Sequence, residues 1–93
     1  MNGVLGIFAL YDEKAEAFLP PWTAPTKAYA MRTVSDMVMD PESMIAKHPA
    51  DYTLFCVGMM SQETGEIVPE KSSLGSGVQF RAHVVGEQVE NAS

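Results

Sequence analysis

The chain has very few of the residues on which covalent and metal chemistry depend. It contains one cysteine and two histidines in 93 residues. A single cysteine forms neither an internal disulfide nor a cysteine-based metal site, which fits a reducing cytoplasm. His48 and His83 belong to no recognised metal-ligand motif. We therefore expect no metal site and no cofactor.

Positive charge and long apolar runs are also scarce. Six Lys and Arg stand against twelve Asp and Glu, and the net charge is −6 at pH 7. Such a chain cannot coat nucleic acid with its whole surface, because that binding depends on neutralising phosphates. The apolar run at residues 4–10 is too short to cross a membrane, and no basic region or cleavage site precedes it. We expect no membrane association.

The most distinctive segment is the proline-rich aromatic run at residues 17–27, with the sequence Ala-Phe-Leu-Pro-Pro-Trp-Thr-Ala-Pro-Thr-Lys. Each proline fixes φ and lacks an N–H, and the residue before a proline favours extended backbone. The run is therefore predicted to be a stiff, extended arm that holds Phe18 and Trp22 and leads into a helix. It cannot be a helix or a central strand itself.

The few cations are concentrated around this arm. Residues 14–35 contain Lys14, Lys27 and Arg32 against Glu16 alone, a balance of +2, and the rest of the chain therefore sums to −8. Charged residues commonly mark only a solvated face. The alternative is that the arm and the following helix form the one surface that tolerates phosphate.

Strands are predicted from apolar runs and alternation. Residues 4–11 and 52–60 are nearly continuous apolar runs, typical of buried strands, and residues 16–19 are predicted to pair back as a short edge strand. Residues 61–66 indicate a hairpin loop before a third strand at 67–68, which Pro69 ends or marks as an edge. We read 72–77 as a flexible link and 78–82 as a fourth strand.

A main helix is predicted at residues 25–39, with Thr23 as its expected cap and one apolar stripe formed by Ala30, Val34, Met37 and Val38. A short second helix is predicted to begin at Pro41, capped by Asp40, and to end before His48-Pro49, with residues 44–46 as its apolar face. The predicted fold is α+β, with a small, mostly antiparallel sheet of three to four strands covered by one main and one short helix. A single domain at 1–85 precedes a frayed acidic tail at 86–93.

No constellation of residues indicates catalysis. Cys56 lies within an apolar run, where a thiol is inert, and no base is evident for it or for Ser35. Gly75 and Gly77 lack the third glycine of a dinucleotide fingerprint, since Phe80 stands in its place. The chain is predicted not to be an enzyme.

Several short motifs occur in an order that resembles a known family. They are residues 18–27, Ala30-Met31-Arg32, Ser35-Asp36, Asp40-Pro41, residues 47–55 and Thr64-Gly65. Over roughly residues 5–69 the chain resembles the small non-structural protein of gokushovirus-type microviruses, the fifth-reading-frame protein of the chlamydial phages. The resemblance implies a protein of the bacterial host cytoplasm that acts with single-stranded viral DNA.

These observations lead to two functional hypotheses. In the first, the chain binds single-stranded DNA weakly and without sequence preference during genome replication or packaging. Bases would stack on Phe18 and Trp22, and phosphates would contact Lys14, Lys27 and Arg32. The opposing interpretation of the aromatics is that both rings fill the sheet edge beneath the arm.

In the second hypothesis, the chain is a dimeric adaptor that contacts a viral or host replication protein and never touches DNA. The net charge of −6 and the methionine-rich apolar strands favour it. Short sheets with open edges commonly associate, so a homodimer is a candidate state.

Overall fold

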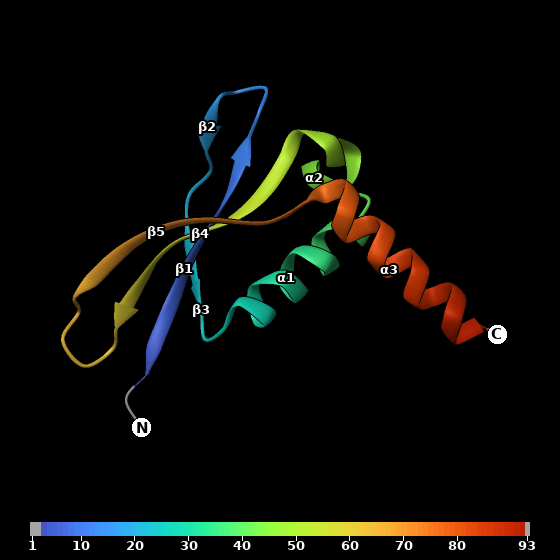
Figure 1. Ribbon diagram of the computed structural model, residues 1–93. Helices are drawn as coiled ribbons and strands as arrows, with labels where there is room; N and C mark the ends of the chain where they lie inside the picture. The colour runs from blue at the N-terminus through green and yellow to red at the C-terminus, as the bar shows by residue number, and fades with distance from the viewer. Residues whose placement is uncertain (1–2, 93) are drawn as a thin grey trace.

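The protein forms an antiparallel sheet with helices packed on one of its faces (Figure 1). The computed structural model describes residues 3–92, with side chains described as far as residue 86. The sheet has five strands in the order β2-β1-β4-β5, and β3 also pairs with β1. This confirms the α+β class, although the predicted sheet was one or two strands too small.

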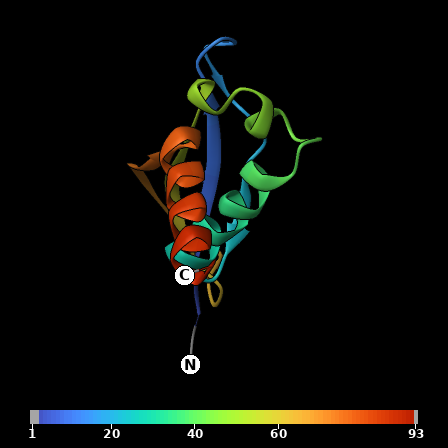
Figure 2. The same ribbon diagram turned by 90° about the vertical axis from the view of Figure 1, so that its right-hand side faces the viewer.

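The strands and helices are as follows in chain order: β1 Val4–Asp12, β2 Ala17–Phe18, β3 Trp22–Ala24, α1 Lys27–Met39, α2 Met44–Lys47, the 3-10 helix η1 Pro49–Asp51, β4 Tyr52–Ser61, β5 Ile67–Ser76 and α3 Gly77–Ala92. The predicted strands at 4–11 and 52–60 are therefore confirmed as β1 and β4. Figure 2 shows the helices in front of the sheet, so that they cover one face and leave the other without a helix within the described residues.

The core lies between the helices and the inner faces of β1 and β4. Phe8 and Cys56 are register partners, as are Leu10 and Leu54, and all four are buried. Because side chains alternate along a strand, the neighbours Ala9 and Phe55 belong to the opposite face. The apolar stripe predicted for α1 covers the inner face, with Ala30, Val34 and Val38 buried.

The proline-rich arm forms one interrupted edge of the sheet. β2 and β3 both pair antiparallel with β1, on the edge away from β4. The Leu19 N–H donates to the Leu10 carbonyl at 2.8 Å, and Pro20 and Pro21 then interrupt the ladder because neither has an N–H to donate. The predicted pairing at 16–19 and the extended arm are both confirmed.

Both helix caps differ from those predicted. Thr23 lies in β3, opposite Ile7, while the hydroxyl of Thr26 caps α1 by accepting the Tyr29 N–H at 3.1 Å. The hydroxyl of Ser43 caps α2 by accepting the Ala46 N–H at 3.1 Å. In each case the true cap stands immediately before the first helical residue, which is where a side chain can reach the free N–H groups.

The region after residue 69 differs most from the prediction. The expected link at 72–77 is largely strand, because β5 continues to Ser76, and Pro69 lies within this edge strand. Residues 78–82 belong to α3 and not to a fourth strand. The expected tail at 86–93 continues α3 as far as Ala92. A reciprocal cap explains the start of this helix: the Ser76 N–H donates to Gln79 Oε1 at 2.8 Å, and the Gln79 N–H donates to Ser76 Oγ at 3.3 Å.

Candidate functional site

The two aromatics of the arm lie on opposite faces of the sheet. Phe18 is the register partner of Tyr11, and Trp22 is the partner of Phe8. Since Phe8 is a core residue and Tyr11 lies three positions further along β1, Trp22 is directed toward the helices and Phe18 away from them. The structure therefore does not unite the two rings into one stacking surface.

Trp22 packs at the margin of the core. Its ring centroid is 6.4 Å from that of Phe8, and its indole Nε1 is buried without a hydrogen-bond partner among the described residues. An indole packed in this way fills the space beneath the sheet edge. This geometry matches the alternative interpretation for Trp22, in which the ring has a packing role.

The three predicted cations also lie apart. Lys14 belongs to the turn between β1 and β2, where its N–H donates to Asp12 Oδ1 at 3.0 Å. Lys27 begins α1, and its Nζ lies 3.2 Å from Glu70 Oε2 of β5. Arg32 lines a cleft between α1 and α3. No single surface holds these cations together with both arm aromatics.

A different cluster forms on the sheet face that no described helix covers. The rings of Tyr11 and Phe18 meet edge to face with centroids 4.9 Å apart, and those of Phe18 and Phe55 are 5.5 Å apart. Tyr11 and Phe55 complete the triangle at 6.5 Å. Phe18 is 41% exposed, and the other two are half-buried. We call Tyr11, Phe18 and Phe55 the aromatic triad.

One cation stands beside the triad. Lys71 of β5 is exposed, and its Nζ is 6.0 Å from the centroid of the Phe55 ring. Lys14 lies in the turn that joins the two strands carrying Tyr11 and Phe18, although Glu13 and Glu16 occupy the same turn. The triad face thus offers aromatic surface with little positive charge, a combination suited to weak contact with a polyanion.

Sequence reasoning found Phe18 but missed Tyr11, Phe55 and Lys71. The apolar runs at 4–11 and 52–60 indicate strands buried on both faces, so they conceal which residues face solvent. The available signal was the alternation of side chains along a strand. Tyr11 and Phe55 directly follow the core residues Leu10 and Leu54, so their side chains face the opposite side of the sheet.

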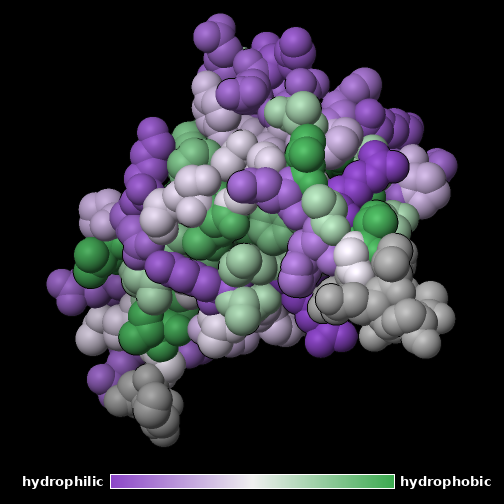
Figure 3. Space-filling view, turned by 45° about the vertical axis from the view of Figure 1, so that its right-hand side comes forward, coloured by the Kyte–Doolittle hydropathy of each residue, from purple (hydrophilic) through white to green (hydrophobic). Residues whose placement is uncertain are grey.

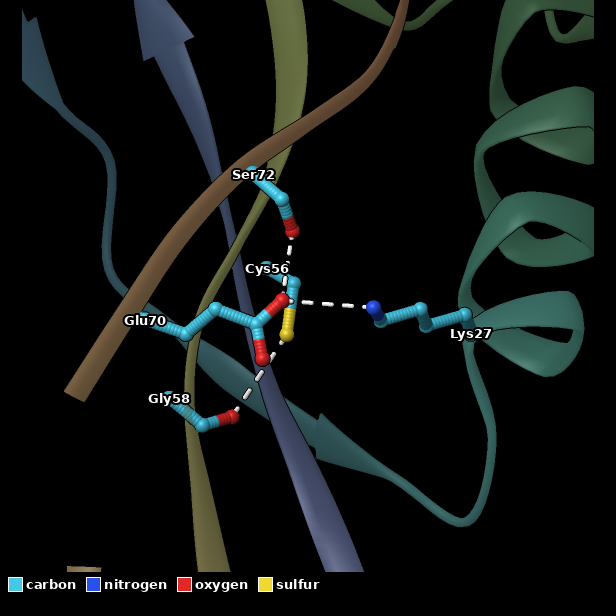
Figure 4. A network of polar contacts seen from close by, with 5 residues as sticks. All are labelled: Lys27, Cys56, Gly58, Glu70 and Ser72. Atoms are coloured by element: carbon cyan, nitrogen blue, oxygen red, sulfur yellow. Dashed lines mark hydrogen bonds and ion pairs between the residues drawn. The ribbon is translucent and has the colours of Figure 1, made fainter. Parts of the chain in front are cut away.

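A polar network lies on the helix side of the sheet, at the β5 edge (Figure 4). Ser72 Oγ donates to Glu70 Oε2 at 2.6 Å, and the ammonium of Lys27 lies beside the same oxygen. The hydrogen bond from Ser72, followed by that from Lys27, lowers the pKa of Glu70 below its usual value. The network joins the first residue of α1 to β5.

Cys56 lies next to this network but is wholly buried. Its Sγ donates to the Gly58 carbonyl at 3.6 Å, and its exposed fraction is 0%. A thiol enclosed in this way cannot meet a substrate without opening of the core. We assign the network a structural role, with Glu70 as its centre.

The lowered pKa of Glu70 predicts a pH effect on stability. A carboxyl whose pKa is lower in the folded state contributes stability above its unfolded pKa, near 4.5, and loses it as pH falls through the folded value. Glu70→Gln should therefore flatten the decline of the unfolding free energy below that pH. Urea denaturation of both forms across this range measures the difference. The effect will be small because both side chains are partly exposed to solvent, and parallel curves for the two proteins would contradict it.

None of the helices in the described part of the chain has the length and apolar character needed to cross a membrane. No group of three or more His, Cys, Asp or Glu among the described residues could hold a metal ion. The fold and the triad face together define a small α+β domain with one open, aromatic sheet face.

The family model of the phage ORF5 protein matches residues 5–80, and the chain belongs to that family. The match confirms a phage protein. It extends past Pro69, the end of the resemblance noted in the sequence, through β5 to Phe80 in α3. No curated protein and no solved structure matches the chain.

Proposed function

We propose that this phage accessory protein binds single-stranded DNA weakly and without base preference on the triad face, during genome replication or packaging in the cytoplasm of the bacterial host. It acts without a cofactor and not as an enzyme. The proposal is carried by three mutually packed aromatic rings with a lysine beside them on an uncovered sheet face. Its microviral setting rests on the resemblance described above.

The physical basis is stacking supplemented by limited charge. Every base has a π-face, so contact with aromatic rings tolerates any sequence and contributes about 1–3 kcal/mol per base. Phe18 is the most exposed ring of the triad and the natural first contact. The net charge of −6 opposes close approach of DNA, which keeps binding weak.

The direct test is titration of a labelled single-stranded oligonucleotide, followed by anisotropy, at several salt concentrations. Affinity should fall as salt rises, with a logarithmic slope of about −0.7 for each phosphate neutralised. Lys71→Ala should make the slope shallower by about 0.7. The matched control is Lys47→Ala, which removes an exposed cation from α2 on the helix side of the sheet.

Trp22 emission separates this proposal from stacking on the arm. Because Trp22 packs against Phe8 on the helix side, its emission should change little when anisotropy reports binding. Strong quenching by the oligonucleotide would instead place the bases at Trp22. Absence of any salt-dependent anisotropy change would end the DNA proposal.

A second candidate is a dimeric adaptor that contacts a viral or host replication protein without touching DNA. The exposure of Ile67 and Val68 at the start of edge strand β5 favours it, since exposed apolar side chains on an edge commonly mark an interaction surface. The adaptor predicts no oligonucleotide binding at any salt concentration, so the same titration distinguishes the two functions.

A further inference from the structure

A cleft of about 900 Å³ lies between α1 and α3, away from the triad face. The α1 side of the cleft includes Met31, Ser35 and Met39, and the α3 side includes Phe80 and Val84. Figure 3, which views the side of the molecule that carries the helices, shows hydrophobic patches set among polar side chains. The cleft therefore offers apolar surface between two helices that already form one layer.

We infer that a second copy of this chain occupies the cleft, with α1 packed antiparallel against α1 of the partner subunit around a two-fold axis near Ser35. This surface is independent of the DNA proposal, because it lies on the opposite side of the sheet. The inference is argued from the arrangement of apolar and charged residues along α1.

The apolar residues are placed symmetrically about Ser35. Met31 precedes it by four residues and Met39 follows it by four, so a two-fold axis at Ser35 brings Met31 against Met39 of the partner subunit. The two methionines are 36% and 41% exposed, and their flexible side chains adapt to an irregular surface. Ser35 is small, and its hydroxyl already donates to the Met31 carbonyl at 3.0 Å, so it can lie at the crossing point.

The charges are complementary under the same symmetry. Arg32 and Asp36 flank Ser35 on one side of the apolar stripe, and both line the cleft. An antiparallel pair places Arg32 near Asp36 of the partner subunit, and Asp36 near Arg32 of the partner subunit. Neither residue forms an ion pair with a described residue of its own chain.

Support of the α1 helix itself does not account for the order of these two charges. A basic residue four positions before an acidic one is the less favourable order for support of a helix, because it opposes the helix dipole. Pairing across the two-fold axis instead forms two Arg32–Asp36 contacts in the dimer, one in each direction. Four helices then form the centre of the dimer, and the two triad faces point outward, free for other partners.

The experiment is sedimentation equilibrium on the intact chain and on charge-reversed variants. The wild type should form a dimer. Arg32→Asp leaves two acidic residues, and Asp36→Arg leaves two basic residues, in each copy of the interface. Each variant should therefore raise the dimer Kd by about tenfold or more. Lys14→Glu, a reversal in the β1–β2 turn, is the matched control and should leave the Kd unchanged.

Mixing the two reversed variants makes the test specific. An acidic copy and a basic copy are complementary, so an equimolar mixture should form a heterodimer with a Kd near that of the wild type. This recovery also shows that both variants are folded. A monomeric wild type, a dimer insensitive to either reversal, or a mixture that does not recover would each overturn the inference.

Discussion

Phe18→Ala is expected to weaken single-stranded DNA binding by roughly 5- to 150-fold, because loss of a stacking ring costs about 1–3 kcal/mol per base. Phe55→Ala should have an effect of the same order. It removes the ring whose centroid lies 5.5 Å from that of Phe18 and over which the Lys71 ammonium is placed. Anisotropy titration at low salt measures both. The two effects should not add fully, because each substitution also displaces the other ring of the pair.

Two comparisons separate loss of contact from loss of structure. Tyr29→Ala removes an aromatic side chain that is 59% exposed on α1, and it should leave DNA affinity unchanged. Trp22 emission reports on the core from the other face of the sheet, so an unchanged spectrum shows that the Phe18 and Phe55 variants remain folded. Equal affinity of Phe18→Ala and wild type would exclude the triad as the binding surface.

Elements defined by local chemistry were predictable from the sequence. The apolar runs gave β1 and β4, and the prolines gave the extended arm, because both depend on the residues within the segment itself. The pairing of β2 with β1 was also predictable, because a short turn brings the second strand back alongside the first. The helix caps were misplaced by three residues each, because several polar residues precede each helix and only one stands at its start.

α3 shows how a short alternating pattern misleads. Val78, Phe80 and Ala82 alternate with polar residues as in a strand, but Phe80 and Val84 also fit helical spacing and turn toward the α1 side. The reciprocal cap of Ser76 and Gln79 was visible in the sequence as Ser-x-x-Gln, and it favoured the helix. The pattern of apolar residues alone fitted both a strand and a helix at residues 78–82, and the cap was the signal that favoured the helix.

The candidate site was less predictable than the fold because it depends on tertiary arrangement. Nothing in residues 4–11 or 52–60 shows that all the helices pack on one face, yet that packing leaves Tyr11 and Phe55 on the open side. Likewise, proximity of Phe18 and Trp22 in the sequence suggested a shared surface. In a regular strand, residues four apart would lie on the same face. Pro20 and Pro21 interrupt the pairing with β1 between Phe18 and Trp22, and the two rings therefore lie on opposite faces.

Gly77→Ala is expected to destabilise the fold by about 1–3 kcal/mol, the cost of overpacking a well-filled site. Gly77 is buried at the first position of α3, and a Cβ there would overlap the Pro49 carbonyl oxygen and come within 2.9 Å of the Pro49 Cα. These are backbone atoms of η1 and cannot move aside as the end of a side chain can. The helix must therefore shift away from η1, which should lower Tm by roughly 5–20 °C for a domain of this size.

The same helix supplies the control for this substitution. Gly86 lies within α3, and a Cβ there would meet nothing within 4 Å. Gly86→Ala should therefore stabilise the protein by up to about 1 kcal/mol, because alanine favours helix over glycine. Thermal unfolding of the two variants should give shifts of opposite sign. Equal shifts would contradict the close packing of α3 on η1 at Gly77. That packing also matters for the α1–α3 cleft, because Phe80, which lines the cleft, follows Gly77 by one helical turn.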